Sequence, residues 1–488
     1  MLKYLYKELY MKQYILGIDE GTTSTRAVVY DCKKGKKISS SASPIKQIYP
    51  HNGWVEQDAS QIVNAQFAAI EQALISAKIK PENISAVAIT NQRESVVAWN
   101  AQTGKPIYNS ICWQCRRTAS EIEKLDRTTV LKIKNRTGLI ADAYFSASKM
   151  AWILNNIPEA KALAKKGLLR MGTIDSYLAY KLTGNFVTDT TNASRTMLFN
   201  IKTLEWDKDM LAIWNIPLEC LPQVVASDAV VGNCSMLGEA PLCAIIGDQQ
   251  SSLFGQNCHK VGDTKVTYGT GGFVLLNTGE NIVSSKKLLT TIAYTIGGKT
   301  HYALEGSIYS ACSGIDWLKN GMGLYKDVSQ TARMAESVPD NGGVYLVPAF
   351  TGLGAPYWNS NARATITGLT FASKPEHIVR AMLESMAYNT LDILNQVETP
   401  LKRISVDGGG SKNKFLLQFL ADITNVKVNK ALNSESTVLG AIKIAERHLN
   451  IVREDDLTKQ EVYLPSMNKA LRNKNIEGWH KAIEKTNI

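Results

Sequence analysis

Short apolar runs alternate along this chain with polar turns and with longer segments whose apolar residues recur at helical spacing. One such segment runs from Asp58 to Ile79, where Asp58 can cap a helix and Pro81 blocks its continuation. This alternation of strand-like and helical patterns predicts the α/β class. The strand-like runs in the first part of the chain are residues 14–18, 26–31, 84–90 and 95–99.

The first strand-like run ends in a carboxylate and a turn of small polar residues. Asp19 closes the run, Gly21 follows after one residue, and a second apolar run begins after Arg26. Glycine lets the backbone approach an anion closely, and the hydroxyl residues at 22–24 offer N–H and O–H donors. We therefore expect a β-hairpin that binds phosphate, with Mg²⁺ between the phosphate and Asp19, rather than an ordinary polar turn.

A similar pattern of apolar runs, a carboxylate and a glycine turn begins again near residue 250. Residues 244–248 form an apolar run that ends in Asp248, and residues 265–276 read as a strand, a Gly/Thr turn and a second strand. A third segment, residues 404–420, places a glycine-rich loop before a helix, where a nucleotide can approach the backbone. The repetition predicts a duplicated architecture with a nucleotide between the halves and a boundary near residues 250–262.

Two familiar motifs are incomplete. Residues 297–300 resemble the end of a P-loop, but Ala293 occupies the earlier glycine position, so we expect a hairpin turn there. Cys112 and Cys115 have the spacing of a redox pair or half a zinc site. Because no second pair or histidine cluster completes such a site, we interpret the eight cysteines as reduced thiols.

Composition narrows the function classes. The chain has 488 residues, 44% of them apolar, and a net charge of +11. Its lysines form short scattered groups without interleaved aromatic residues, which favours a solvated surface and an anionic substrate over nucleic acid. No apolar run approaches the length of a membrane span, so we expect no stable membrane insertion. Residues 1–10 make a poor signal peptide, which favours a cytoplasmic protein; they read either as a loose extension or as the product of a misassigned start.

Several longer segments together resemble the FGGY family of carbohydrate kinases, a branch of the actin/hexokinase ATPase fold. The resemblance implies two ribonuclease-H-like (actin-like ATPase) domains with a nucleotide-binding cleft between them. The first, residues 13–256, would bind a polyol and carry the first phosphate hairpin; the second, residues 257–488, would carry the second hairpin and the adenosine site. The segments that carry the resemblance are residues 17–26, 89–94, 104–108, 113–118, 191–199, 247–250, 268–271 and 348–358.

The resemblance also implies an activity. It is the ATP-dependent phosphorylation of glycerol to sn-glycerol 3-phosphate by direct in-line transfer, with ATP and Mg²⁺ as cofactors. It implies a homodimer or homotetramer and no nucleic-acid partner. Two alternatives stay open: a kinase for another polyol or sugar such as erythritol or xylulose, and a non-catalytic actin-like ATPase.

The resemblance assigns roles to individual residues. Asp248 would be the catalytic base, and Asp19 and Asp248 would hold the metal. The polyol-binding residues would be Thr22, Arg93, Glu94, Trp113, Tyr144, Asp248, Gln249 and Phe273. The residues for phosphates and nucleotide would be Thr22, Thr23, Ser24, Arg26, Thr270, Cys312, Asp316, Gly409 and Asn413.

The chain departs from the family pattern at several positions. Glu20 stands where the family usually has glutamine, which we expect to add negative charge near the metal. Cys312 and Asp316 stand where the family has glycine and glutamine near the adenine. Residues 231–241 correspond to a loop that binds fructose 1,6-bisphosphate in many bacterial members, but here the stretch is shorter and contains no arginine or histidine. We therefore expect neither inhibition by that compound nor control by histidine phosphorylation at this loop.

Overall fold

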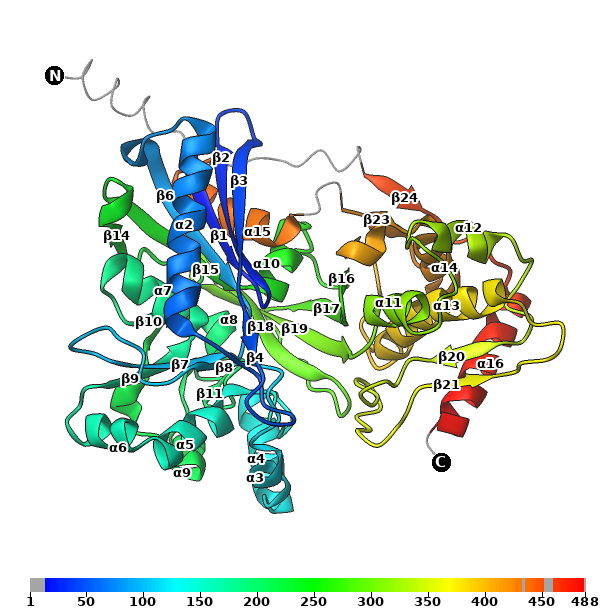
Figure 1. Ribbon diagram of the computed structural model, residues 1–488, viewed down its shortest axis with the longest axis horizontal. Helices are drawn as coiled ribbons and strands as arrows, with labels where there is room; N and C mark the ends of the chain where they lie inside the picture. The colour runs from blue at the N-terminus through cyan, green and yellow to red at the C-terminus, as the bar shows by residue number, and fades with distance from the viewer. Residues whose placement is uncertain (1–13, 432–434, 452–459, 487–488) are drawn as a thin grey trace. The chain divides into compact units, whose positions relative to one another are not determined.

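The computed structural model describes residues 14–431, 435–451 and 460–486. These residues form two compact units, each built around a β-sheet with flanking helices (Figure 1). Each unit is assembled from more than one stretch of the chain. The first takes the described parts of Met1–Gly255, Thr291–Tyr302 and Thr437–Glu454, and the second takes those of Gln256–Thr290, Ala303–Ser436 and Asp455–Ile488. The N-terminal extension inferred at residues 1–10 lies outside the described residues.

A six-stranded sheet forms the centre of the first unit, in the order β14-β15-β6-β1-β2-β3. β1 pairs antiparallel with β2 and parallel with β6, and β6 pairs parallel with β15. The parallel strands are almost wholly buried, as their near-continuous apolar sequences predict. The strands are β1 (Tyr14–Glu20), β2 (Ser24–Asp31), β3 (Lys36–Pro44), β6 (Ile84–Asn91), β14 (Gly232–Cys234) and β15 (Ala240–Gly247).

Helices cover both faces of this sheet. The helix α2 (Ala59–Ala77) packs against β2 and β3, and the Asp58 side chain caps it by accepting hydrogen bonds from two backbone amides. The helix α15 (Ser436–His448) crosses β1 so closely that a Cβ atom on Gly17 would lie 2.6 Å from Val438 Cγ2. Only glycine fits at that crossing. Figure 1 shows α2 in front of the sheet and α15 behind it.

A second, five-stranded sheet in the first unit has the order β4-β5-β8-β7-β9. Its strands are β4 (Gln47–Ile48), β5 (Glu56–Gln57), β7 (Val96–Asn100), β8 (Ser110–Ile111) and β9 (Leu169–Thr173). Two short pairs accompany it, β10 (Val187–Asp189) with β13 (Gln223–Val225) and β11 (Phe199–Asn200) with β12 (Glu205–Trp206). The remaining helices of this unit are α3 (Ala119–Glu123), α4 (Arg127–Thr137), α5 (Ser146–Asn156), α6 (Pro158–Lys165), α7 (Ile174–Thr183), α8 (Thr190–Ala193), α9 (Lys208–Trp214) and α10 (Asp248–Gly255).

A seven-stranded sheet has the order β18-β19-β17-β16-β22-β23-β24. The strands β16, β17, β22, β23 and β24 belong to the second unit, whereas most of β18 and the start of β19 fall in the Thr291–Tyr302 stretch given above to the first unit. β16 pairs antiparallel with β17 and parallel with β22, which repeats the pairing of β1 with β2 and β6. The strands are β16 (Asp263–Tyr268), β17 (Gly272–Gly279), β18 (Leu289–Ile296), β19 (Lys299–Ile308), β22 (Arg403–Asp407), β23 (Val428–Lys430) and β24 (Glu461–Tyr463), and a separate pair joins β20 (Tyr345–Val347) to β21 (Thr365–Thr367).

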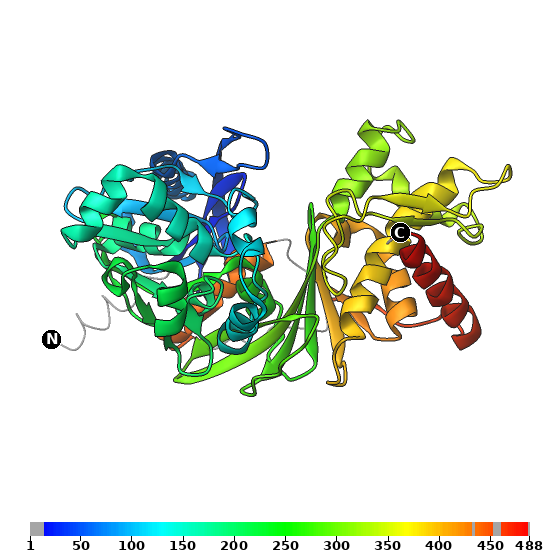
Figure 2. The same cartoon turned by 90° about the horizontal axis from the view of Figure 1, so that it is seen from below.

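A large apolar core holds the helices of the second unit together. The ring of Trp479 stacks on that of Tyr388 with centroids 5.2 Å apart, and both residues are buried. This contact joins α16 to α13, the dark red and yellow-orange helices of Figure 2. The helices are α11 (Cys312–Asn320), α12 (Gln330–Glu336), α13 (Pro375–Leu394), α14 (Lys414–Thr424) and α16 (Lys469–Thr486).

The hairpin turn expected at residues 297–300 is present. The P-loop-like stretch at residues 297–300 includes the turn between β18 and β19, and the Gly297 and Gly298 backbones have positive φ. Cys112 and Cys115 are buried and unbonded, and burial raises the pKa of the Cys112 thiol, which opposes thiolate chemistry. Over the described ranges, none of the helices combines the length and apolarity needed to traverse a bilayer.

Candidate active site

Three parallel strands of the first unit end at the same edge of the sheet. In the register of β1, β6 and β15, Glu20 pairs with Asn91, and Asn91 pairs with Gly247. Asp248 follows β15 directly and begins α10. The carboxyl ends of strands in α/β sheets are where ligands bind. This edge therefore gathers Asp19, Glu20, residues 91–94 and Asp248 from three distant parts of the chain.

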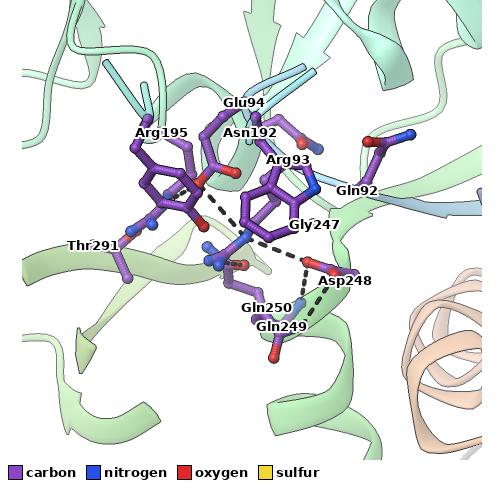
Figure 3. A network of polar contacts seen from close by, with 12 residues as sticks. Gln92, Arg93, Glu94, Asn192, Arg195, Gly247, Asp248, Gln249, Gln250 and Thr291 are labelled. Carbon is purple, nitrogen blue, oxygen red and sulfur yellow. Dashed lines mark hydrogen bonds and ion pairs between the residues drawn. The ribbon is translucent and has the colours of Figure 1, made fainter. Parts of the chain in front are cut away.

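A chain of ion pairs crosses this edge (Figure 3). Arg93 Nε lies 3.3 Å from Asp248 Oδ1 and 3.8 Å from Glu94 Oε1. Arg195 Nε lies 2.7 Å from the same Glu94 oxygen. Three of the side chains are essentially buried, whereas the Asp248 side chain is 31% exposed. The network therefore ends in one carboxylate that a small molecule can reach.

Asp248 is held by its neighbours without being enclosed. Its Oδ1 accepts a hydrogen bond from the Gln249 amide at 2.7 Å, and its Oδ2 accepts one from Gln249 Nε2 at 3.0 Å. Arg93 is fixed in turn, because Arg93 Nη1 donates to Gln250 Oε1 at 3.1 Å and Gln250 Nε2 donates to the Ile292 carbonyl. A positioned carboxylate of this kind can accept a proton from a bound hydroxyl group.

Glu94 has an unusual backbone. Its φ is 62°, in the left-handed region that few residues other than glycine adopt. The carbonyl of Glu94 accepts a hydrogen bond from the Ser146 hydroxyl at 3.0 Å, which helps to hold this conformation. Backbone strain of this kind concentrates at sites of binding and catalysis.

Aromatic side chains lie beside the ionic network. Trp113 and Tyr144 meet edge to face with ring centroids 5.6 Å apart, and Trp113 Nε1 donates to Thr22 Oγ1 at 3.0 Å. Tyr144 is held by the buried Lys149, whose Nζ donates to the Tyr144 carbonyl and its two neighbours. Desolvation lowers the pKa of Lys149 to about 8. The first unit thus brings charged and amide side chains together with aromatic rings.

Glu20 lies in an environment that its residue type does not reveal. It is fully buried, and burial raises the pKa of its carboxyl group well above the usual range. A hydrogen bond from Gln92 opposes this shift, and the nearby charges of Asp19 and Asp248 add to it. Burial thus opposes ionisation of Glu20 and works against the extra negative charge expected at this position.

The predicted Mg²⁺ site relies on two carboxylates, those of Asp19 and Asp248. Within residues 14–431, 435–451 and 460–486, no group of three or more His, Cys, Asp and Glu side chains is arranged to hold a metal ion. Asp19 and Asp248 are nevertheless close enough to Glu20 to influence its pKa. Asp19 also lies opposite Arg26 in the register of β1 and β2.

The remaining residues of the first hairpin, Thr23 and Ser24, lie at its turn. Gly21 N donates to the Ser24 carbonyl at 3.0 Å, which closes the turn, and the Thr23 side chain is exposed. The predicted hairpin is therefore present, with hydroxyl groups at its tip.

The second unit carries a matching turn. Gly269 N donates to the Gly271 carbonyl at 2.9 Å, and the Thr270 carbonyl accepts from Ala311 N at 3.0 Å. Cys312 begins α11 against this turn, donating from its amide to the Gly269 carbonyl at 3.0 Å. Burial raises the pKa of the Cys312 thiol to about 11, and the nearby Asp316 adds to the shift.

The glycine-rich loop after β22 meets the same turn. Gly408 has φ 81°, and a Cβ atom there would lie 2.5 Å from the Tyr268 carbonyl oxygen. Gly409 begins a 3₁₀ turn, and Asn413 caps α14 by accepting from the Leu416 amide at 3.0 Å. The structure therefore brings Thr270, Cys312 and the glycine loop together within the second unit.

Phe273 belongs to the second unit as well. It lies on β17 opposite Thr267 and is half-buried.

Sequence reasoning missed two members of the network. Arg195 falls within residues 191–199, which carry the family resemblance, yet no role was assigned to it. Gln250 directly follows Gln249 and was also left without a role. Their partners lie 101 and 157 residues away along the chain, so spacing alone gives no signal for these contacts.

The whole chain matches known proteins. Models of the FGGY family of carbohydrate kinases match residues 14–255 (N-terminal domain) and 264–448 (C-terminal domain). The glycerol kinase of Clostridium botulinum and glycerol kinase 2 of Sulfolobus acidocaldarius are each 47% identical over 97% of this chain and 98% of their own length.

Solved structures agree with this assignment. A crystal structure of Plasmodium falciparum glycerol kinase with ADP matches with a TM-score of 0.91 and 36% identity, over 97% of this chain and 98% of that one. The ligand-bound xylulose kinase of Lactobacillus acidophilus matches with a TM-score of 0.86 and 25% identity, over the same shares. These matches confirm the predicted α/β class and actin/hexokinase-type ATPase fold. This chain therefore belongs to the FGGY family of carbohydrate kinases.

Proposed function

We propose that this chain transfers the γ-phosphoryl group of ATP to a terminal hydroxyl of glycerol, giving sn-glycerol 3-phosphate and ADP. The observation that carries the proposal is the partly exposed Asp248 carboxylate, held by Arg93 beside Glu94 and two aromatic rings. The names of the full-length relatives support glycerol as the acceptor. The crystal structure of the P. falciparum relative with ADP supports ATP as the donor.

The polar groups suit a small polyol. Glycerol offers three hydroxyls on a short apolar backbone, so it needs several hydrogen-bonding groups and an apolar surface. The hydrogen-bonding groups are those of Arg93, Glu94 and Gln249. In the first unit, the apolar surface is formed by Trp113 and Tyr144. We also assign Phe273, on β17 of the second unit, to the polyol. Charged groups bind hydroxyls more strongly than neutral ones do, which favours the arginine and glutamate contacts.

Asp248 acts as the general base. An alcohol is a poor nucleophile, so the Asp248 carboxylate accepts its proton while the hydroxyl oxygen attacks the γ-phosphorus in line with the leaving group. The new O–P bond forms as the bond to the β–γ bridging oxygen breaks, and ADP leaves. Arg93 fixes the base and orients the acceptor, so the reacting groups start close together.

The two hairpins bind the nucleotide phosphates. We assign Thr22, Thr23, Ser24 and Arg26 of the first hairpin and Thr270 of the second to the phosphate oxygens. Backbone amides and hydroxyls in tight glycine turns are suited to this task.

The adenosine part of the nucleotide lies against the glycine-rich loop of the second unit. We assign Gly409 and Asn413 to it, with Cys312 and Asp316 of α11 beside them. The Cys312 side chain is apolar in character when its thiol is protonated, which suits contact with a base.

Mg²⁺ fits the carboxylates of the first unit. Mg²⁺ is usually held by one or two carboxylates together with waters and substrate phosphates, so a pair of aspartates suffices. Asp19 and Asp248 supply oxygen ligands of the preferred kind, and the ion when bound neutralises charge on the transferring phosphoryl group. A compartment with ATP that keeps eight thiols reduced, as the cytoplasm does, suits this chemistry.

A polyol panel tests the assignment. The full chain is assayed for ADP formation with Mg²⁺ and ATP in the presence of glycerol, erythritol or xylulose, with a sample lacking any polyol as the reference. We expect glycerol to give the highest kcat/KM. Higher turnover with another polyol would support kinase activity but contradict glycerol as the substrate. Turnover that is independent of every polyol would mean that the chain is an ATPase and not a kinase.

A further inference from the structure

Arg195 is fully buried, and it is not among the residues assigned to the polyol, the nucleotide or the metal. It lies two residues beyond α8, and its Nε is 2.7 Å from Glu94 Oε1. Neither side chain of this pair is more than 2% exposed. Burying two charges is tolerable only when they pair closely, so each side chain dictates the position of the other.

Glu94 forms ion pairs with Arg195 and with Arg93, and the contact with Arg195 is the shorter. The other, with Arg93 Nε, spans 3.8 Å. Arg93 also faces Asp248 and Gln250, so its guanidinium is shared among several acceptors. The Arg195 contact therefore sets the place of the Glu94 carboxylate more strongly than the Arg93 contact does.

The Arg195 guanidinium also lies against aromatic rings. Its Cζ is 5.3 Å from the centre of the Phe145 ring and 5.8 Å from that of Tyr144. Contacts of this kind between a cation and a ring are attractive at these distances. The Arg195 side chain thus contacts both the Glu94 carboxylate and the Tyr144 ring, which are assigned to the polyol.

The segment that carries Arg195 is fixed to the same sheet edge. Asp189 caps α8, and the Arg195 amide donates to the Asn192 carbonyl at 3.0 Å. The Asn192 and Asn91 side chains exchange hydrogen bonds at 3.0 and 3.2 Å. Gly247 N donates to Thr191 Oγ1 at 2.9 Å. These contacts leave Arg195 little freedom to move.

We infer that Arg195 is the positioning residue of the polyol pocket: without touching substrate, it holds the Glu94 carboxylate and the Tyr144 ring where they receive the acceptor hydroxyls. This inference rests on the proposed function, because it takes the polyol as the ligand of Glu94 and Tyr144. It predicts that Arg195 governs the affinity for glycerol and leaves the nucleotide affinity unchanged.

The test compares two matched arginines. Arg380 Nε lies 2.7 Å from Glu384 Oε1 in the second unit, so Arg380→Lys makes the same chemical change in a pair of equal length outside the polyol site. In the full chain, we expect Arg195→Lys to raise the KM for glycerol about tenfold or more, with the KM for ATP within about twofold of the unsubstituted value. We expect Arg380→Lys to leave both KM values within about twofold.

A second variant guards against a folding defect. Arg195→Ala removes the guanidinium, and added guanidinium ion at concentrations well below denaturing levels is expected to restore part of its kcat/KM for glycerol. A KM for glycerol that is unchanged in Arg195→Lys, or KM values for glycerol and ATP that rise together, would overturn the positioning role. Absence of glycerol-dependent ADP formation in the unsubstituted chain would instead overturn the proposed function and the polyol role of Arg195 with it.

Discussion

The two glycine–threonine hairpins, one in each unit, share a backbone plan and differ in the charges that surround them. Each joins two antiparallel strands by a three-residue turn, and each has a parallel strand on its other side. The strand before the first turn ends in Asp19 and Glu20, whereas the strand before the second ends in Thr267 and Tyr268.

The aspartates near the two hairpins, Asp407 and Asp248, differ in exposure and in the contacts that they make. Asp407 at the end of β22 is buried and accepts hydrogen bonds from the side chains of Gln256, Thr267 and Ser436. Asp248 at the end of β15 is partly exposed and is held mainly by Arg93 and Gln249. The Asp407 carboxylate is buried and hydrogen-bonded within the protein, whereas the Asp248 carboxylate is exposed enough to contact a ligand. On the proposed assignment, the first hairpin lies beside the general base, whereas the strand before the second hairpin carries no carboxylate at its end.

The largest expected effect separates these two aspartates. Asp248→Asn removes the base, so we expect kcat to fall about 10³-fold with little change in the free energy of unfolding. Asp407→Asn turns an acceptor of three hydrogen bonds into a group that cannot accept them all. We expect it to lower the free energy of unfolding by about 1–3 kcal/mol while kcat changes far less.

Steady-state kinetics and thermal denaturation on both variants measure these outcomes. If Asp407→Asn lost as much kcat as Asp248→Asn at unchanged stability, the contrast between the hairpins would be wrong.

Glycine substitutions extend the comparison to the backbone. Gly408→Ala places a Cβ atom 2.5 Å from a carbonyl oxygen at φ 81°, a conformation reserved for glycine. We expect a loss of about 2–3 kcal/mol in stability and a raised KM for ATP. Gly21→Ala places its Cβ atom 3.1 Å from the Ser24 carbonyl oxygen, so we expect a smaller loss. Urea unfolding ranks the two, and an equal or reversed ranking would contradict the structure.

Threonine substitutions at the two turns are expected to have milder and different effects. Thr22→Val leaves the Trp113 indole N–H without its acceptor and removes a hydroxyl assigned to the phosphates, so we expect the KM for glycerol to rise about fivefold and the KM for ATP to rise with it. Thr270→Val is expected to raise the KM for ATP by a similar factor and to leave that for glycerol unchanged. Kinetics with both substrates varied separate the two changes, and a glycerol effect of Thr270→Val would count against the division of roles.

The smallest effect is expected at Glu20. Because burial favours its neutral form, Glu20→Gln replaces one neutral hydrogen-bonding group by another of the same shape. We expect kcat to stay within about twofold. Asp19→Asn is the matched change one residue earlier, and we expect it to raise the Mg²⁺ concentration for half-maximal rate by about tenfold. Magnesium titrations of both variants test this, and equal shifts would mean that Glu20 is charged.

Much of the fold could be predicted from local sequence. The runs around the Gly21 and Thr270 turns alternate apolar strands with small polar residues, so both hairpins follow from nearest neighbours. The helix after Asp58 has its cap and its apolar spacing within the same stretch. The crossing of α15 over β1 could not be predicted, because Gly17 and Val438 meet only after the intervening chain has folded.

The candidate site divides in the same way. Asp248, Arg93 and Glu94 end apolar runs, so their arrival at one sheet edge follows from the parallel strand pattern. Arg195 follows no strand, and its role depends on a partner 101 residues away. The raised pKa of Glu20 depends on burial by the surrounding layers, which residue type alone does not reveal.

One measurement tests the central claim most directly. The full chain is mixed with Mg²⁺, ATP and glycerol, and ADP and organic phosphate are quantified in the same sample by a coupled assay and phosphorus NMR. The account predicts equal amounts of ADP and glycerol 3-phosphate, formed only with glycerol and lost in Asp248→Asn. Inorganic phosphate released at a rate independent of glycerol, or ester formation that persists in Asp248→Asn, would contradict it.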